Sequence, residues 1–74
     1  MTQTSGQVHI IGAGLLGTSI GLRLSNLGVQ VSLEDQSEEN LQTAIRLGAG
    51  RNLIDGDQVS TVVVCIPPKA TADQ

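Results

Sequence analysis

Short apolar runs alternate along the chain with stretches of helical periodicity. Residues 8–11, 29–33 and 59–66 are rich in Val, Ile and Leu, and their continuous or alternating apolar positions predict strands. Between the first two strands, four apolar residues at spacings of four, four and three share one helical face: Leu16, Ile20, Leu24 and Leu27. They predict a helix that begins at Leu15 and is stopped by Gly28.

A second helix is predicted between the second and third strands. Ser37 offers a side-chain oxygen to the free amides of a helix start, and the two glutamates that follow it place negative charge at the positive end of the helix dipole. One face of this helix carries Leu41, Ala44, Ile45 and Gly48. Gly48 or Gly50 is expected to end the helix.

The order of elements is therefore strand, helix, strand, helix and strand. Residues 51–58 have room for one short edge strand before the turn signal at Asp55 and Gly56. Pro67 and Pro68 stop the last strand, because proline cannot donate to a sheet. This alternation predicts an α/β fold with a parallel βαβαβ sheet, right-handed crossovers and helices packed on the strands.

Length and composition limit what the chain can be. Its 74 residues make at most one small domain, which we expect at residues 8–69, with an N-terminal tail at 1–7 and a short C-terminal end at 70–74. The chain has no Phe, Tyr or Trp, so its core must come from Val, Ile, Leu and Ala. The net charge of -3 argues against a nucleic-acid partner, which needs clustered positive charge.

The cysteine content and the length of the apolar runs exclude several other classes of protein. Cys65 is the only cysteine, which rules out an internal disulfide and a thiolate metal cluster, and we predict no metal site. No apolar run approaches the roughly 20 residues of a membrane helix, and the first residues lack the pattern of a secretory signal. We therefore expect a cytoplasmic protein that does not associate with membranes.

Three glycines between the first strand and the first helix carry the most specific signal. Gly12, Gly14 and Gly17 are spaced as GxGxxG, and a carboxylate ends the next strand about 20 residues later, as in a dinucleotide-binding fingerprint. Gly12 permits the tight turn, Gly14 lets a pyrophosphate approach the backbone, and Gly17 lets the helix pack close to the strand. The fold predicted is thus one half of a Rossmann-type doubly wound dinucleotide-binding domain.

The same fingerprint predicts the cofactor and its contacts. The backbone amides of Leu15 and Leu16 at the helix start would meet the pyrophosphate. Asp35, with Glu34 as the alternative, would accept hydrogen bonds from the adenosine ribose hydroxyls. A 2′-phosphate would meet that carboxylate as a like charge, and Gln36 follows it instead of an arginine, so we predict NAD rather than NADP.

The glycines and the polar residues near them also allow other interpretations. The glycines could simply turn the chain, and the loop of a nucleoside-triphosphatase is excluded by Thr18, which stands where a lysine is required. His9 in the first strand is expected to be a hydrogen-bonded structural residue. Cys65 is expected to pack as a small hydrophobe, although it could lie near the cofactor. The hydroxyls of Thr18 and Ser19 would contact either phosphate or their own backbone.

The stretch GAGLLGTSIGLRL, together with LED after the second strand and VVVCIPP at the last, resembles the nucleotide-binding part of prephenate and arogenate dehydrogenases. These are NAD(P)-dependent oxidoreductases of tyrosine, and hence aromatic amino acid, biosynthesis. The resemblance implies a parent enzyme that decarboxylates prephenate oxidatively to 4-hydroxyphenylpyruvate, or arogenate to tyrosine. The related β-hydroxyacid dehydrogenases share the glycines and the proline-ended strand.

The resemblance also implies that the chain is an N-terminal piece of such an enzyme and inactive alone. The family's catalytic histidine and substrate-binding arginine fall beyond its end, and His9 and Arg23 match neither, so no catalytic residue is predicted. A regulatory module that senses NAD with the same fold is the alternative function. The last strand would present an unpaired apolar edge, from which we predict self-association, as a homodimer or through that edge.

Overall fold

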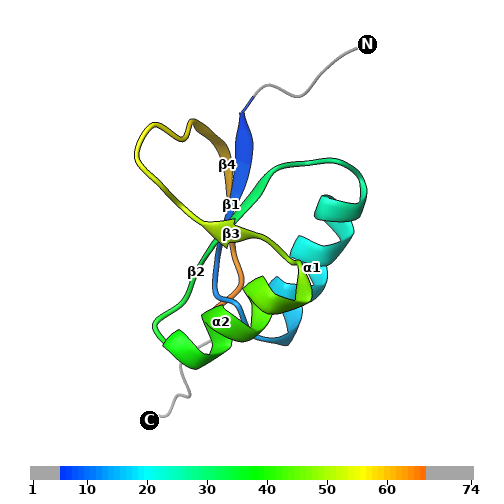
Figure 1. Cartoon of the computed structure of the whole chain (residues 1–74), viewed down its shortest axis with the longest axis vertical. Helices are drawn as coiled ribbons and strands as arrows, with labels where there is room; N and C mark the ends of the chain where they lie inside the picture. The colour runs from blue at the N-terminus through cyan, green and yellow to red at the C-terminus, as the bar shows by residue number, and fades with distance from the viewer. Residues whose placement is uncertain (1–5, 67–74) are drawn as a thin grey trace, which may run out of the picture.

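Strand β1 (Gln7–Ile11) lies inside a parallel sheet of four strands in the computed structural model, which describes residues 6–66. The strand order is β3-β2-β1-β4, and the remaining strands are β2 (Val31–Glu34), β3 (Arg51–Asn52) and β4 (Val59–Val64). Helix α1 (Leu15–Asn26) connects β1 to β2, and α2 (Glu38–Leu47) connects β2 to β3 (Figure 1). The predicted α/β fold with a parallel βαβαβ unit is confirmed.

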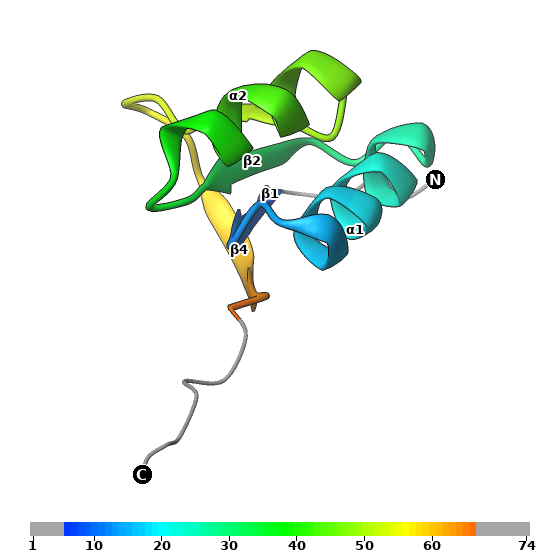
Figure 2. The same cartoon turned by 90° about the horizontal axis from the view of Figure 1, so that it is seen from below.

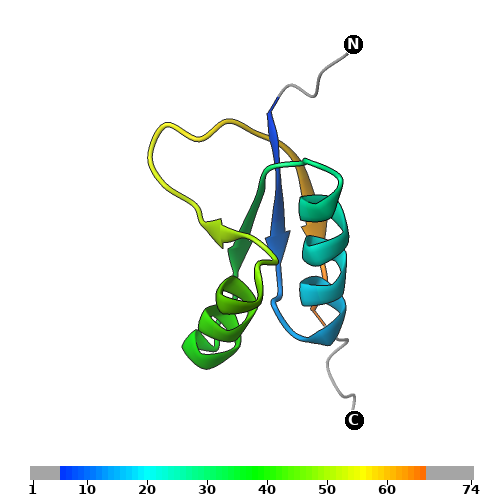
Figure 3. The ribbon, with the colours of Figure 1, turned by 45° about the vertical axis from the view of Figure 1, so that its right-hand side comes forward.

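All four strands run in the same direction, so their carboxyl ends lie at one edge of the sheet (Figure 3). The turn from β1 into α1 lies at that edge. β1 begins at Gln7, so this residue belongs to the sheet and not to the N-terminal tail of residues 1–7 predicted from the sequence. The prolines at 67 and 68 and the C-terminal end at 70–74 lie outside the described residues.

Both helices pack on the same face of the sheet (Figure 2). The register pairs Ile10 with Leu33 and Val63, whose side chains point to this helical face. Their neighbours along the strands, beginning with His9 and Ser32, point to the opposite face. Helices of the described residues 6–66 cover only one face of the sheet, although His9 on the other face is also buried.

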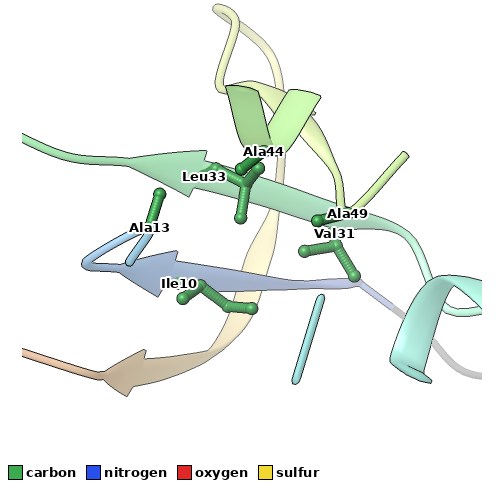
Figure 4. Close-up of a cluster of buried hydrophobic side chains, with 6 residues drawn as sticks. All are labelled: Ile10, Ala13, Val31, Leu33, Ala44 and Ala49. Carbon is green, nitrogen blue, oxygen red and sulfur yellow. The ribbon is translucent and has the colours of Figure 1, made fainter. Parts of the chain in front are cut away.

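The core between sheet and helices is small and entirely aliphatic. Its buried members are Ile10, Ala13, Val31, Leu33, Ala44 and Ala49 (Figure 4). Three of these six are alanines, which allow the helices to lie close to the strands. Close approach compensates for the missing aromatic rings, because packing density matters more to a core than the size of its side chains.

Helix α1 packs on the sheet through its glycines and through only part of the apolar face predicted from its periodicity. Gly17 and Gly21 are its buried residues, whereas Leu16 and Leu27 are 62% and 72% exposed. A Cβ atom on Gly21 would come within 2.5 Å of the backbone oxygen of Ala49. A backbone this close leaves no room for a side chain at position 21. Ile20 and Leu24 of the predicted face pack against the core, and only its two end residues are exposed.

Helix α2 begins and ends where the sequence predicts. The Ser37 hydroxyl accepts a hydrogen bond from the amide of Asn40 at 3.2 Å, which satisfies one free donor of the first turn. Gly48 follows the last helical residue with φ of 93°, the left-handed conformation that glycine adopts at little cost. The cap fixes the loop between β2 and α2, and the stop fixes the turn from α2 toward β3.

The amino-terminal edge of the sheet is held by an ion pair. Arg51 donates from both terminal nitrogens to the two carboxylate oxygens of Asp57, each at 3.1 Å, and also to the side-chain oxygen of Gln7 at 3.2 Å. These hydrogen bonds from the guanidinium lower the pKa of the Asp57 carboxyl. The contacts tie the loop after β3 to the start of β1, and β3 is the short edge strand expected within residues 51–58.

Candidate functional site

The turn between β1 and α1 is shaped by backbone contacts that only glycine allows. Gly12 has φ of 108°, and its amide donates to the carbonyl of Glu34 at 2.7 Å. A Cβ atom at this position would lie 2.7 Å from the backbone oxygen of Cys65. The turn is thus pressed between the ends of β2 and β4, as its predicted role in a tight turn requires.

The other two glycines differ sharply in their surroundings. A Cβ atom on Gly17 would overlap the carbonyl of Gly12 and approach Ile10 to 3.3 Å, which explains why the helix can lie so close to the strand. A Cβ atom on Gly14 would meet nothing within 4 Å. Gly14 therefore faces open space, and a ligand can reach the backbone there.

The start of α1 presents unpaired backbone amides to this space. The first helical hydrogen bond runs from Thr18 N to Gly14 O at 2.9 Å, so the amides of the residues between them have no acceptor within the helix. No acidic residue stands in the first turn, and the N-cap residue is Gly14, which has no side chain to fold over the amides. Donors and helix dipole together make this end suited to an anion.

The hydroxyl of Thr18 does not contribute to this anion site. It donates to the carbonyl of Ala13 at 3.0 Å, the second of the two roles considered for it from the sequence. Ser19, its neighbour, is exposed.

Asp35 joins the glycine turn to the start of α2. One oxygen of its carboxylate accepts a hydrogen bond from the Ala13 amide, and the other accepts one from the Ser37 amide, each at 2.6 Å. These short, charge-assisted bonds hold the carboxylate in a single orientation beside the glycines. Each oxygen retains acceptor capacity for a second donor.

A cavity of about 460 Å³ lies between the glycine turn and the ends of β2 and β4. It is lined by Ile11, Gly12, Gly14, Glu34, Asp35, Gln36, Asn40, Cys65 and Ile66. Four residues singled out from the sequence line it together: Gly12, Gly14, Asp35 and its alternative Glu34. Gly17 lies behind the turn, and the predicted contacts Leu15 and Leu16 have exposed side chains and do not line the cavity.

The sequence interpretation missed several residues of the cavity wall. Gln36 and Asn40 belong to the loop and first turn of α2, and their proximity to Asp35 in the chain was the available signal. Ile66 was missed although it follows the last strand. Ligands of parallel sheets bind beyond the carboxyl ends of the strands, so the residues after each strand could all have been nominated. Cys65, noted only as a possible neighbour of the cofactor, also lines the wall.

His9 lies on the helix-free face of the sheet, and its side chain is 8% exposed. Its Nδ1 lies 2.7 Å from the hydroxyl of Ser32, and its Nε2 lies 2.9 Å from a carboxylate oxygen of Glu34. The hydrogen-bonded histidine expected from the sequence is therefore confirmed. Its partners could not be named before the register of β1 and β2 was known.

Comparisons with known proteins identify a family and a relative of this chain. The family model described as "3-hydroxyacyl-CoA dehydrogenase, NAD binding domain" matches residues 7–59. The chain is also 44% identical over 59 residues to a probable prephenate dehydrogenase, NovF, of Streptomyces niveus. The alignment covers 80% of this chain but only 16% of that relative. No solved structure matches. Within residues 6–66, no helix has the length and apolar character needed to cross a membrane.

Proposed function

The chain belongs to the family of 3-hydroxyacyl-CoA dehydrogenase NAD-binding domains, and from this premise we propose that its cavity holds the adenosine diphosphate half of NAD. The observation that carries the proposal is the pairing of two groups across one cavity. Gly14, which directly precedes the unpaired amides of α1, lines one side, and the fixed carboxylate of Asp35 lines the other. A pyrophosphate needs the first group and a ribose diol needs the second.

On the anion side, the amides of Leu15 and Leu16 would donate to the pyrophosphate oxygens. Their side chains are 91% and 62% exposed, so neither blocks the approach of a ligand to the helix start. Gly14 would lie beneath the phosphates, where any side chain would occupy their space. Gly12 and Gly17 would act indirectly, because they set the turn that brings these amides to the cavity.

On the ribose side, Asp35 would accept hydrogen bonds from the two hydroxyls while keeping its bonds to the backbone. A 2′-phosphate would bring its negative charge against Asp35 and against Glu34, which lines the same wall. Gln36 supplies no positive charge there. The proposed cofactor is therefore NAD, and NADP is disfavoured by like-charge repulsion.

For the parent enzyme we propose a prephenate or arogenate dehydrogenase, in which the nicotinamide accepts a hydride during oxidative decarboxylation. Support comes from the 44% identity to the probable prephenate dehydrogenase. The chain spans about a sixth of the length of that relative, so the substrate and the chemistry stay proposals. No residue of this chain is assigned a catalytic role, and its own part is to hold the adenosine half of the cofactor.

A second candidate parent is a dehydrogenase of β-hydroxyacid type. The matching family model describes a 3-hydroxyacyl-CoA dehydrogenase, whose substrate carries its hydroxyl on the β carbon. The two candidates require the same cofactor site. Assays of NAD reduction by the intact parent protein with prephenate, arogenate and a 3-hydroxyacyl thioester would separate them.

Self-association is proposed from the edge of the sheet. β4 is the last strand in the order β3-β2-β1-β4, and one of its sides has no neighbour among the described residues. Its six residues, VSTVVV, carry no charge, and its valines at 62 and 64 are 53% and 63% exposed. An uncharged, β-branched edge is a template for pairing with another strand, and a second copy offers an identical one.

The cofactor proposal is tested by titrating the isotope-labelled chain with NAD and with NADP while recording backbone amide resonances. We expect shifts concentrated in residues 12–17 and 35–40, larger with NAD at equal concentration. Amides of the Arg51–Asp57 pair at the opposite edge serve as an internal control and should not move. A folded chain whose cavity amides stay unchanged at millimolar NAD would refute the assignment of these residues.

A further inference from the structure

The helix-free face of the sheet carries a hydrogen-bonded trio, of which the proposed cofactor site uses only Glu34. His9 on β1 lies between Ser32 and Glu34 on β2, with its two ring nitrogens 2.7 Å and 2.9 Å from their side-chain oxygens. Ser32 is fully buried, and the histidine side chain is 8% exposed. Glu34 is 60% exposed at its side chain and reaches the wall of the cavity.

Glu34 is the only ionisable group that contacts His9 among the described residues. On β4, the register partner of His9 is Val62, which carries no charge. On β3, the nearest charged residue of this face is Arg51, and its guanidinium is already paired with Asp57. A charge on the imidazole ring therefore acts most strongly on the Glu34 carboxylate.

The trio can hold His9 in either protonation state without moving. In the neutral ring, Nε2–H donates to Glu34 and the Ser32 hydroxyl donates to Nδ1. In the charged ring, Nε2–H still donates to Glu34, while the Ser32 hydroxyl rotates and accepts from Nδ1–H. In both states each ring nitrogen keeps a hydrogen-bond partner, so a proton can be added to the ring without breaking its contacts to Ser32 and Glu34.

From these contacts we propose that His9 is a positioning residue for cofactor specificity. Through Nε2 it holds the Glu34 carboxylate at the cavity wall, and the charge of its ring sets how strongly that wall repels a 2′-phosphate. This inference rests on the proposed binding of a nicotinamide dinucleotide in the same cavity. Asp35 remains the contact for the ribose diol, and Glu34 adds the pH-dependent part of the discrimination between NAD and NADP.

The expected effect follows from the charge balance of the wall. With His9 neutral, Glu34 and Asp35 present two negative charges to the adenosine end of the ligand. With His9 protonated, the imidazolium compensates Glu34 and one negative charge remains. Removing one unit charge about 4 Å from a 2′-phosphate improves binding by about fivefold when the dielectric constant between the charges is that of water. NAD has no 2′-phosphate, so its affinity should change much less.

The test measures the affinities of NAD and NADP by calorimetry between pH 5.5 and pH 8. Wild type is compared with His9→Gln and Glu34→Gln. A phosphate monoester itself gains a proton near pH 6, and this contribution is present in all three proteins. The preference is the ratio of the dissociation constant of NADP to that of NAD. As the pH falls from 8 to 5.5, we expect this ratio to decrease about fivefold more in wild type than in His9→Gln. Glu34→Gln should show the narrower preference at every pH.

Identical pH profiles of the NAD-to-NADP preference in wild type and His9→Gln would overturn the inference. If burial of glutamine at position 9 unfolds the chain, Glu34→Gln carries the test, because that side chain is largely exposed. A preference in Glu34→Gln that equals the wild-type value at pH 8 would also overturn it.

A second measurement separates failure of this inference from failure of the cofactor proposal. His9 is the only histidine, so its ring carbon resonance can be followed with pH in the ligand-free chain without ambiguity. We expect the side-chain carboxyl resonance of Glu34 to shift with the same midpoint as the ring. A carboxyl resonance that ignores the ring titration would refute the positioning role, even if both dinucleotides bind. Absence of dinucleotide binding with a coupled titration would refute the cofactor proposal, and with it the role in specificity, but not the coupling between His9 and Glu34.

Discussion

Two glycines of the same turn should separate folding from binding when each is replaced. Gly12→Ala places a Cβ atom 2.7 Å from the Cys65 carbonyl oxygen and imposes φ of 108° on alanine. The strained backbone costs about 1–3 kcal/mol, and the overpacking adds about 1–3 kcal/mol. A domain of this size rarely has more than about 3–5 kcal/mol of stability, so most of it should be lost.

Gly14→Val is the matched variant for binding. Gly14 has φ of -77°, which any residue adopts, and a Cβ atom there meets nothing within 4 Å. The cost in stability should stay below about 1 kcal/mol, as for a change at a helix N-cap. The two added methyl groups would occupy the space proposed for the pyrophosphate, and we expect NAD affinity to fall at least tenfold, about 1.4 kcal/mol.

Urea unfolding followed by far-ultraviolet circular dichroism measures the first effect, and calorimetric titration with NAD measures the second. Gly14→Ala is the graded control, and we expect it to fall between wild type and valine in affinity while its unfolding midpoint stays near that of wild type. A Gly14→Val protein that binds NAD as wild type does would refute the placement of the pyrophosphate. A Gly12→Ala protein as stable as wild type would refute the account of the turn.

Three further expectations concern the helix cap, the sheet edge and the ion pair. Ser37→Ala should lower the free energy of unfolding by about 1 kcal/mol, with Ser37→Asp as the control that restores it; equal unfolding midpoints would contradict the capping role. Val62→Lys, which puts a charge on β4, should shift sedimentation at high concentration toward monomer, whereas a wild-type chain already monomeric under those conditions would remove the basis for self-association. The pKa of Asp57 is lowered from its ordinary 3.8 in the folded chain, so its contribution to stability is present above that pH and is lost as the pH falls through the lowered value. Relative to Asp57→Asn, wild type should therefore lose stability as the solution is acidified below about pH 4; parallel stability curves for the two proteins would refute this.

Local signals in the sequence were sufficient for the elements and for the glycine turn. Ser37 and Gly48 mark the ends of α2 by chemistry that acts within a few residues, and the structure uses both. Gly12 and Gly17 have the tight-turn and close-packing roles expected from their spacing. These features could be predicted because each depends on neighbours in the chain.

Features that depend on contacts between distant segments could not be predicted in the same way. The packing face of α1 was predicted only in part, because periodicity counts apolar side chains such as Ile20 and Leu24, whereas this helix also approaches residue 49 through the bare backbone of Gly21. The contacts of His9 with β2 require the parallel register, which places it opposite Ser32. The bond from Ala13 to Asp35 likewise joins two loops that are 22 residues apart in the chain.

The aliphatic core also determines how this protein can be observed. Because the chain has no Phe, Tyr or Trp, it has neither intrinsic fluorescence nor near-ultraviolet bands from aromatic side chains. Any aromatic absorbance or emission that appears when a dinucleotide is added therefore belongs to the adenine or nicotinamide ring. The absorbance and emission of a bound dinucleotide can therefore be recorded without a background signal from aromatic side chains of the protein.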